Sequence, residues 1–491
     1  MKIHGRIAIT AMAGLCFVLS PAAHADELAE LRARLDRVEK DNQQLRAEVG
    51  QLKNENSESW LSGKRAEEIK SLVEEVIADA DSRASLLQDG MTSGFNNGFF
   101  IGSADGRFLL QIGGLIQARY LYNHRGSAPG GNDQGDTNES GFDMARIRLE
   151  VAGYIGDPRF TYAIRFGPDR EDSEVLGEKA IIGYHPTDRL SFFAGDDKAG
   201  FLREETTSPA MQLAVERSLV AEVFTVGYIQ GIWATWMVTD EIQLYASLND
   251  GVRSGEADNE SNSAFVTAPD GDGDLEAIHK SFFLDRTDIA GTFRIDWKLA
   301  GNWQQYEDFS AWSGEPFAAF LGAAIHLELG ETGSGTGGGG SGDNDNFLLW
   351  TVDASIENEG FNVFASAVGL HTQLDKAQDL NMYGVVLQAG YMVVPDKLEP
   401  FVRAEWINLD GRNATGKNDL LLFTIGTNYY LIRHRAKFTA DVMWVANNLP
   451  GSSVLGLQDN QDYDQTLGHL GLRSSTDYNQ WVFRIQFQLL F

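Results

Sequence analysis

The chain has 491 residues, a formal net charge of −30 at pH 7 and one cysteine. This excess of acidic residues argues against binding to nucleic acid, which needs clustered Lys and Arg. After residue 90 no stretch stays apolar for the roughly 18 residues of a membrane-spanning helix, so a membrane protein with this sequence would have to cross as a closed β-barrel.

Residues 1–25 have the organisation of a secretory signal peptide. Lys2 and Arg6 precede an apolar run at 7–19, and Ala23 and Ala25 place small residues where a signal peptidase would cleave. We expect this segment to be removed. Because the one cysteine, Cys16, lies within it, the mature chain is expected to have no disulfide and no cysteine-based metal or catalytic site.

Residues 26–60 carry a heptad repeat that predicts a coiled coil. Asn42 and Asn56 occupy two of the a positions, where Asn fixes the register and number of strands. A lone charged helix is the alternative. Residues 61–94 are expected to add a second helical piece and a Gly/Asn hinge. The apolar members of the repeat are Leu28, Leu31, Leu35, Val38, Leu45, Val49 and Leu52.

From residue 107 onward, apolar and polar residues alternate with a period of two, which is typical of strands with one apolar and one polar face. The last segment, "NQWVFRIQFQLLF", shows the pattern clearly, with aromatic and aliphatic residues on one face and Gln and Arg on the other. We predict sixteen strands, at 107–124, 142–155, 159–167, 178–185, 189–197, 226–238, 241–249, 286–298, 317–329, 346–357, 361–370, 382–394, 399–408, 419–431, 435–446 and 479–491.

The connections between these segments alternate between short turns and long loops rich in Gly, Asp, Asn and Ser. This layout is typical of outer-membrane barrels, with turns at one rim and loops at the other. The connection 299–316 is long where a turn is expected, and a strand within it would change the count. A soluble sandwich or propeller is the alternative fold. The sequence favours an all-β fold: a transmembrane antiparallel barrel of about 16 strands in residues 95–491, preceded by the N-terminal α-helical coiled coil.

Several segments resemble the phosphate-selective porin O and P family. They are "FDMARIRLEVAGYIGDPRFTY", "LSFFAGDDKAGFLREETTSPAMQLAVERS", "LEPFVRAEW" and "IGTNYYLIRHRAKFTADV". The resemblance implies a sixteen-stranded trimeric porin whose third loop folds into the bore and whose basic residues conduct anions. The final aromatic, Phe491, resembles the signal that outer-membrane barrels present to the barrel-assembly machinery.

The inward face is expected to hold both signs of charge. Basic side chains lower the barrier for anions, and neighbouring carboxylates cancel that effect. The trio Arg146, Arg148 and Arg165 is our preferred anion contact, with structural salt bridges as the alternative. The channel-lining candidates are Arg119, Arg146, Arg148, Arg165, Arg294, Arg403, Lys437 and Arg484; the third-loop constriction candidates are Lys198, Arg203 and Arg217, beside Glu204, Glu205, Glu216 and Glu222.

A weak calcium candidate lies in "PDGDGDLE", where Asp270, Asp272 and Asp274 alternate as in calcium-binding loops. Leu275 stands where such a loop needs Gly, so a solvated acidic loop, or divalent bridging to lipopolysaccharide, are the other interpretations. No cofactor is expected, and no catalytic constellation is recognisable, although a barrel enzyme remains the rival class.

We therefore expect a passive porin of the bacterial outer membrane, embedded in lipid and lipopolysaccharide, with its coiled coil in the periplasm. It would be a homo-oligomer, expected to be a trimer. A substrate-specific solute channel and a structural link between outer membrane and cell wall are the alternatives.

Overall fold

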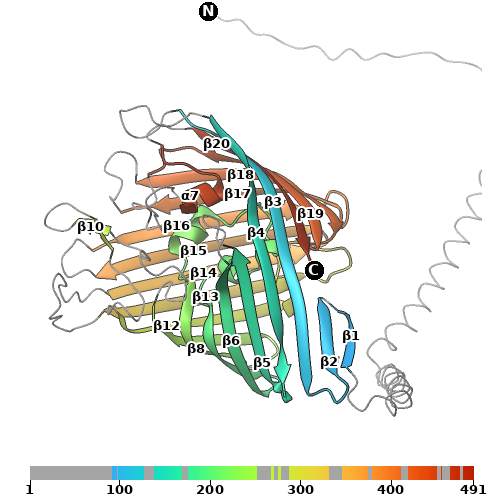
Figure 1. Cartoon of the computed structure of the whole chain (residues 1–491). Coiled ribbons are helices and arrows are strands. Elements are labelled where there is room, and N and C mark those ends of the chain that lie inside the picture. Colours follow the sequence, from blue (N-terminus) through green and yellow to red (C-terminus); the bar gives the residue numbers. More distant parts are fainter. Residues whose placement is uncertain are drawn as a thin grey trace, which may run out of the picture. The chain divides into compact units, whose positions relative to one another are not determined.

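Sixteen antiparallel strands close into a barrel in the computed structural model (Figure 1). The structure describes residues 91–96, 98–126, 138–168, 175–251, 267–269, 275–277, 287–330, 346–373, 379–410, 418–450, 455, 465–475 and 479–491. The barrel strands are β3 (Phe108–His124), β4 (Asn138–Ile155), β5 (Asp157–Pro168), β6 (Val175–Thr187), β7 (Leu190–Lys198), β8 (Tyr228–Met237), β9 (Ile242–Asn249), β12 (Thr287–Ala300), β13 (Ala318–Gly330), β14 (Asn346–Asn358), β15 (Phe361–Gln373), β16 (Asn381–Tyr391), β17 (Leu398–Asn408), β18 (Asp419–Ile432), β19 (Ala436–Val445) and β20 (Gln480–Leu490).

Closure comes from the pairing of the last strand with the first. β20 pairs antiparallel with β3, from Leu490 opposite Leu115 to Trp481 opposite His124. Every other barrel strand pairs with its neighbours in order, and β9 pairs with β12. Two short strands, β10 (Thr267–Pro269) and β11 (Leu275–Ala277), form a separate hairpin. The predicted all-β fold with sixteen barrel strands is confirmed.

A further hairpin precedes the barrel. β1 (Met91–Phe95) pairs with β2 (Phe99–Ser103), which extends the sheet along the edge of β3 that β20 leaves uncovered. Residues 91–94, expected as part of a hinge, form most of β1 in this hairpin, and the hinge between the N-terminal segment and the barrel stays a prediction. The expected signal peptide, coiled coil and helical piece, residues 1–90, lie outside the described residues.

The two faces of the wall differ as the alternation predicts, since successive side chains of a strand point to opposite faces. On β12, Phe293, Ile295 and Trp297 point outward and are 38–48 % exposed, whereas Arg294 and Asp296 point inward and are buried. The same contrast holds on β20, where Trp481 is exposed and Arg484 is buried. The outer surface of the barrel is therefore apolar, whereas the interior holds charged and polar side chains together with a buried apolar cluster.

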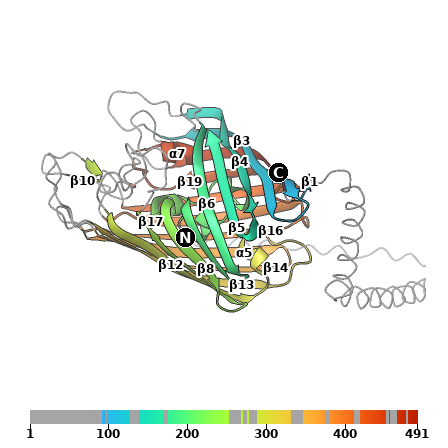
Figure 2. The same ribbon diagram turned by 60° about the horizontal axis from the view of Figure 1, so that its bottom comes forward.

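Three inserted segments fill much of the interior. The first is the loop 199–227, hereafter the third loop, with α3 (Arg203–Thr206), a 3₁₀ turn η1 (Pro209–Met211) and α4 (Leu219–Phe224). The second follows β12 and carries α5 (Trp303–Tyr306), which lies near the ends of β13 and β14 (Figure 2). The third carries α7 (Gln465–Leu470), whose leucines join a buried apolar cluster with α4.

The connection expected at 299–316 begins with the last two residues of β12 and contains no further strand, so the count of sixteen stands. Its chain turns inward, and Phe309, Ala311 and Trp312 are at most 3 % exposed. Phe309 packs against Phe364 of β15, with ring centroids 4.8 Å apart. None of the helices in the described ranges is long and apolar enough to span a membrane.

Candidate functional site

A cavity of about 460 Å³ lies between the β3–β7 wall and the third loop. Leu490 and Phe491 line it, and so do residues 205–209 and Arg217 of the third loop. We call this cavity the chamber. Its charged lining residues are Arg148, Glu150, Arg165, Lys179, Asp197, Lys198, Glu205 and Arg217.

The chamber cations on β4, β5 and β6 each form an ion pair with a carboxylate. The Arg148 Nε lies 2.5 Å from the Glu178 Oε2. The Arg165 Nη2 lies 2.5 Å from the Glu150 Oε2, and these two residues face each other across β4 and β5.

Lys179 on β6 continues this wall row. It stands opposite Arg165, and its Nζ lies 2.7 Å from the Asp197 Oδ2. The wall is therefore nearly neutral along the row from Glu150 to Asp197.

Lys198 and Arg217 differ from the wall cations, because they bond to backbone carbonyls instead of carboxylates. Lys198 Nζ donates to the Glu205 carbonyl oxygen at 3.1 Å. Arg217 donates to the carbonyl oxygens of Glu204, Glu205 and Thr207 at 2.9–3.0 Å. Among the described residues, neither cation forms an ion pair with a carboxylate.

The nearby acid Glu222 is a weak counter-charge for Arg217. Burial raises the pKa of the Glu222 carboxyl, although Arg217 opposes that rise. Burial also lowers the pKa of Arg217, but a guanidinium stays charged at neutral pH. A mobile anion in the chamber would therefore meet the Arg217 guanidinium and the Lys198 amine, neither of which forms an ion pair with a described carboxylate, although Glu205 and Glu222 lie near both.

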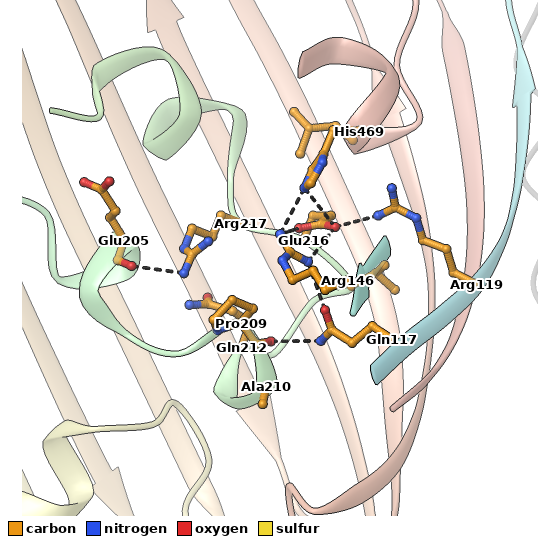
Figure 3. A network of polar contacts seen from close by, with 12 residues as sticks. Gln117, Arg119, Arg146, Glu205, Pro209, Ala210, Gln212, Glu216, Arg217 and His469 are labelled. Carbon is orange, nitrogen blue, oxygen red and sulfur yellow. Dashed lines mark hydrogen bonds and ion pairs between the residues drawn. The ribbon is translucent and has the colours of Figure 1, made fainter. Parts of the chain in front are cut away.

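Behind the third loop, Glu216 collects several basic partners (Figure 3). Its carboxylate accepts from Arg146 through two bonds, at 2.9 and 2.7 Å, and from Arg119 Nη1 at 2.5 Å. His469 Nε2 of α7 lies 3.2 Å from Glu216 Oε1 and 2.9 Å from Arg146 Nη2. Burial would raise the pKa of Glu216, but Arg146, His469 and Arg119 hold that pKa well below its usual range.

This cluster changes the expectation for the early arginine trio. Arg148 and Arg165 line the chamber, but Arg146 does not. Arg146 is 8 % exposed, and its guanidinium contacts Glu216, Gln117 and His469. The structure thus places Arg146 and Arg119 in the interior wall, away from the chamber lining.

The other expected lining residues also point inward and are buried, where they bond to inserted segments and to wall carboxylates. Arg294 donates to the Phe201 carbonyl oxygen at 2.9 Å, Arg403 to that of Glu216 at 2.8 Å and Arg484 to that of Leu470 at 3.0 Å. Arg294 bonds Asp296 and Asp353, Arg403 bonds Glu405, and Arg484 bonds Asp441. Lys437 donates to the Gln212 carbonyl oxygen at 2.7 Å. None of these four basic residues lines the chamber.

Arg203, expected at the constriction, lies in an aromatic box on the opposite side. Its guanidinium carbon lies 4.0 Å from the centre of the Tyr306 ring and 5.4 Å from those of Phe309 and Phe320. Of the three third-loop candidates, Lys198 and Arg217 therefore reach the chamber and Arg203 does not. The calcium candidates Asp270, Asp272 and Asp274 lie outside the described residues.

Lys179 is a lining residue that the sequence reasoning missed. The alternation along β6 could have identified it. Ile182 and Tyr184 point outward, so Lys179, an odd-numbered residue of the same strand, is expected to point inward. The polar lining at 206–208 could not be found in this way, since it depends on how the third loop folds.

Comparisons with known proteins agree with this architecture. Residues 120–281 match the family described as phosphate-selective porin O and P. No curated protein matches the sequence.

Several solved barrels resemble the chain at low sequence identity. An anion-selective porin from Comamonas acidovorans is 11 % identical, with a TM-score of 0.49 over 78 % of this chain and 100 % of that one. The outer membrane channel DcaP of Acinetobacter baumannii is 12 % identical, with a TM-score of 0.45 over 78 % and 98 %. The outer-membrane expressed OmpT of Vibrio cholerae is 9 % identical, with a TM-score of 0.47 over 78 % and 98 %.

Such distant likenesses say nothing about what this chain conducts. The family match is a separate finding, and it confirms the resemblance carried by the sequence segments around β3–β8. Residues 120–281, about a third of the chain, are thus similar to porins of the phosphate-selective porin O and P family.

Proposed function

We propose that this porin is a water-filled channel for small hydrophilic solutes with a preference for anions, and that the permeation path runs through the chamber. The observation that carries the proposal is the pair Lys198 and Arg217, two chamber cations that bond to backbone carbonyls and form no ion pair with a carboxylate of the described residues. Rings of basic side chains lower the barrier for anions in pores.

The paired cations contribute less to this preference. Salt screens charges over about 8 Å under physiological conditions, so the nearest neighbours dominate the field on a permeating ion. A guanidinium within 3 Å of a carboxylate, such as Arg165 beside Glu150, presents a dipole to the path. Arg148 and Arg165 are therefore secondary contacts, and Arg119, Arg146, Arg294, Arg403, Lys437 and Arg484 serve mainly to hold the wall and the inserts.

Planar-bilayer recordings in asymmetric salt test the proposal. Lys198→Gln and Arg217→Gln should each lower the anion-to-cation permeability ratio, and together they should bring it close to one. Arg159→Gln is the control, because Arg159 lies near the start of β5 and pairs with Asp157, two residues before it, outside the chamber. A reversal potential that is the same for the wild type and the double variant would rule out this path.

The same recordings separate the two alternative functions. A substrate-specific channel would show block of the current by its solute, whereas a structural link to the cell wall would give no conductance steps. Ohmic steps in simple salt support the general porin. Calcium added at the 270–274 loop side should leave the steps unchanged if that acidic loop is only solvated.

We further propose that the mature protein begins after residue 25 and assembles as a trimer, with residues 26–60 as a periplasmic coiled coil. Closed cyclic symmetry suits both a barrel trimer and a three-stranded coil. Intact-mass measurement of protein from outer membranes tests the cleavage. Mass photometry in detergent, with and without residues 26–60, tests the trimer and the contribution of the coil.

A further inference from the structure

Glu216 occupies a position that no other acid of the third loop shares. It is 1 % exposed and faces the β3–β4 wall, where it accepts from Arg119 and Arg146 at once (Figure 3). Glu204 of the same loop bonds instead to the backbone N–H and the hydroxyl of Ser218, both at 2.7 Å. Glu205 lines the chamber.

Arg119 and Arg146 depend on Glu216 to different degrees. Arg119 also pairs with Asp143, with its Nε 2.7 Å from the Asp143 Oδ2. Arg146 has Glu216 as its carboxylate partner among the described residues, and its other bonds go to Gln117 Oε1, at 3.0 Å, and to His469. Loss of the Glu216 charge would leave Arg146 with neutral or basic partners.

Arg146 is near enough to the chamber for this loss to matter. It lies two residues before Arg148 on the inward face of β4, and Arg148 lines the chamber. Its charge also acts on Arg217, which follows Glu216 in the chain. Glu216 thus pairs with Arg146, which lies close to the path, and it is the residue directly before Arg217, which lines the path.

We propose that Glu216 is a specificity-determining residue of this porin: its carboxylate masks Arg146 and thereby limits the preference for anions. α7 completes the mask from the other side, because His469 contacts both Glu216 and Arg146. The inference rests on the proposed function, since it assumes that the chamber carries the ions.

Bilayer recordings of Glu216→Gln test the mask. The amide keeps the shape and the acceptor oxygen but removes the charge, so the anion-to-cation permeability ratio should rise roughly threefold, as expected for one partly screened charge near the path. The double variant Glu216→Gln/Arg146→Gln should return the ratio to the wild-type value. Glu204→Gln is the matched control, because it removes one charge from the same loop without freeing an arginine of the β3–β4 wall.

Each outcome has a distinct meaning. If Lys198→Gln and Arg217→Gln leave the ratio unchanged, the proposed path itself fails. If those variants behave as proposed but Glu216→Gln matches Glu204→Gln, or the double variant does not restore the ratio, Glu216 is only a structural anchor. Heat-modified mobility on gels verifies that each barrel is folded.

Two other variants test the mask if Glu216→Gln does not fold. Arg146→Gln alone should lower the ratio by less than either Lys198→Gln or Arg217→Gln, because a masked guanidinium contributes little to the path. A drop as large as that of Lys198→Gln would overturn the mask. Glu216→Asp, which keeps the charge, should retain a ratio close to the wild type.

Discussion

At the scale of single residues, ion pairs decide what the inside of this barrel presents. The sequence places many arginines on the inward face, but most of them form an ion pair with a nearby acid. Arg484 is an extreme case: it is fully buried, and it bonds both oxygens of Asp441 at 2.7 and 2.8 Å. Asp441 also accepts from the backbone N–H of Val215 at 3.0 Å, so the pair holds the third loop as well.

Asp441→Asn is expected to destabilise the barrel by about 3–5 kcal/mol, because it leaves the buried Arg484 without its charge partner. Urea unfolding of the refolded protein, followed by tryptophan fluorescence, measures the change. Asp240→Asn serves as control: Asp240 pairs with Arg189 on the exposed surface, where a salt bridge is worth about 1 kcal/mol or less. Equal midpoints for the two variants would contradict this account of Asp441.

At the scale of elements, the segment 301–317 is the least expected feature. Asn302 and Gln305 form a capping box that starts α5, and the chain then runs along the inner wall. Trp312 packs edge-on against Tyr430 of β18, with ring centroids 4.8 Å apart, and donates to Asp308 at 2.9 Å. His434, in the turn after β18, bonds the same Asp308 at 3.0 Å.

The anchoring of this segment should depend on pH through His434. Burial lowers the pKa of His434, although the bond to Asp308 opposes that effect. The folded state therefore favours the neutral ring. This contribution to stability is complete above the unfolded-state pKa of about 6.5 and is lost as the pH falls below it.

We expect the urea midpoint to fall between pH 7.5 and pH 5, and the fall to be smaller in His434→Gln. His124→Gln is the control, because His124 is exposed and its ring bonds to Asn138, the residue opposite it on β4. An identical pH dependence in wild type and His434→Gln would show that other groups carry the effect.

At the scale of the whole molecule, the apolar outer face must lie in hydrocarbon for the interior to be a channel. Ile325 is 44 % exposed at the middle of β13, and Leu329 is 49 % exposed near its end. Both belong to the surface that would contact lipid acyl chains in an outer-membrane barrel.

Ile325→Arg should destabilise the folded barrel in phospholipid vesicles by about 2–4 kcal/mol, and Leu329→Arg by about 0–1 kcal/mol, because the cost of a charge falls toward the interface. Reversible folding into vesicles at increasing urea concentration gives both values. Equal costs at the two depths would mean that this face does not sit in a bilayer.

Much of this architecture could be predicted from the sequence. The period-two alternation determined the strands and which residues point inward, because a strand allows its side chains only two directions. It placed Arg148, Arg294 and Arg484 on the inner face, where the structure has them. The same alternation predicts that Lys179 points inward.

Only the tertiary structure decided which inward cations form an ion pair with a carboxylate of the described residues and which bond to backbone carbonyls instead. Arg146 meets His469, 323 positions away, and Arg119 meets Glu216, 97 positions away, because the third loop and α7 fold back into the barrel. Alternation along one strand says nothing about such partners. For that reason the sequence preferred Arg146 as an anion contact, whereas the fold turns that arginine to Glu216 and leaves Lys198 and Arg217 facing the chamber.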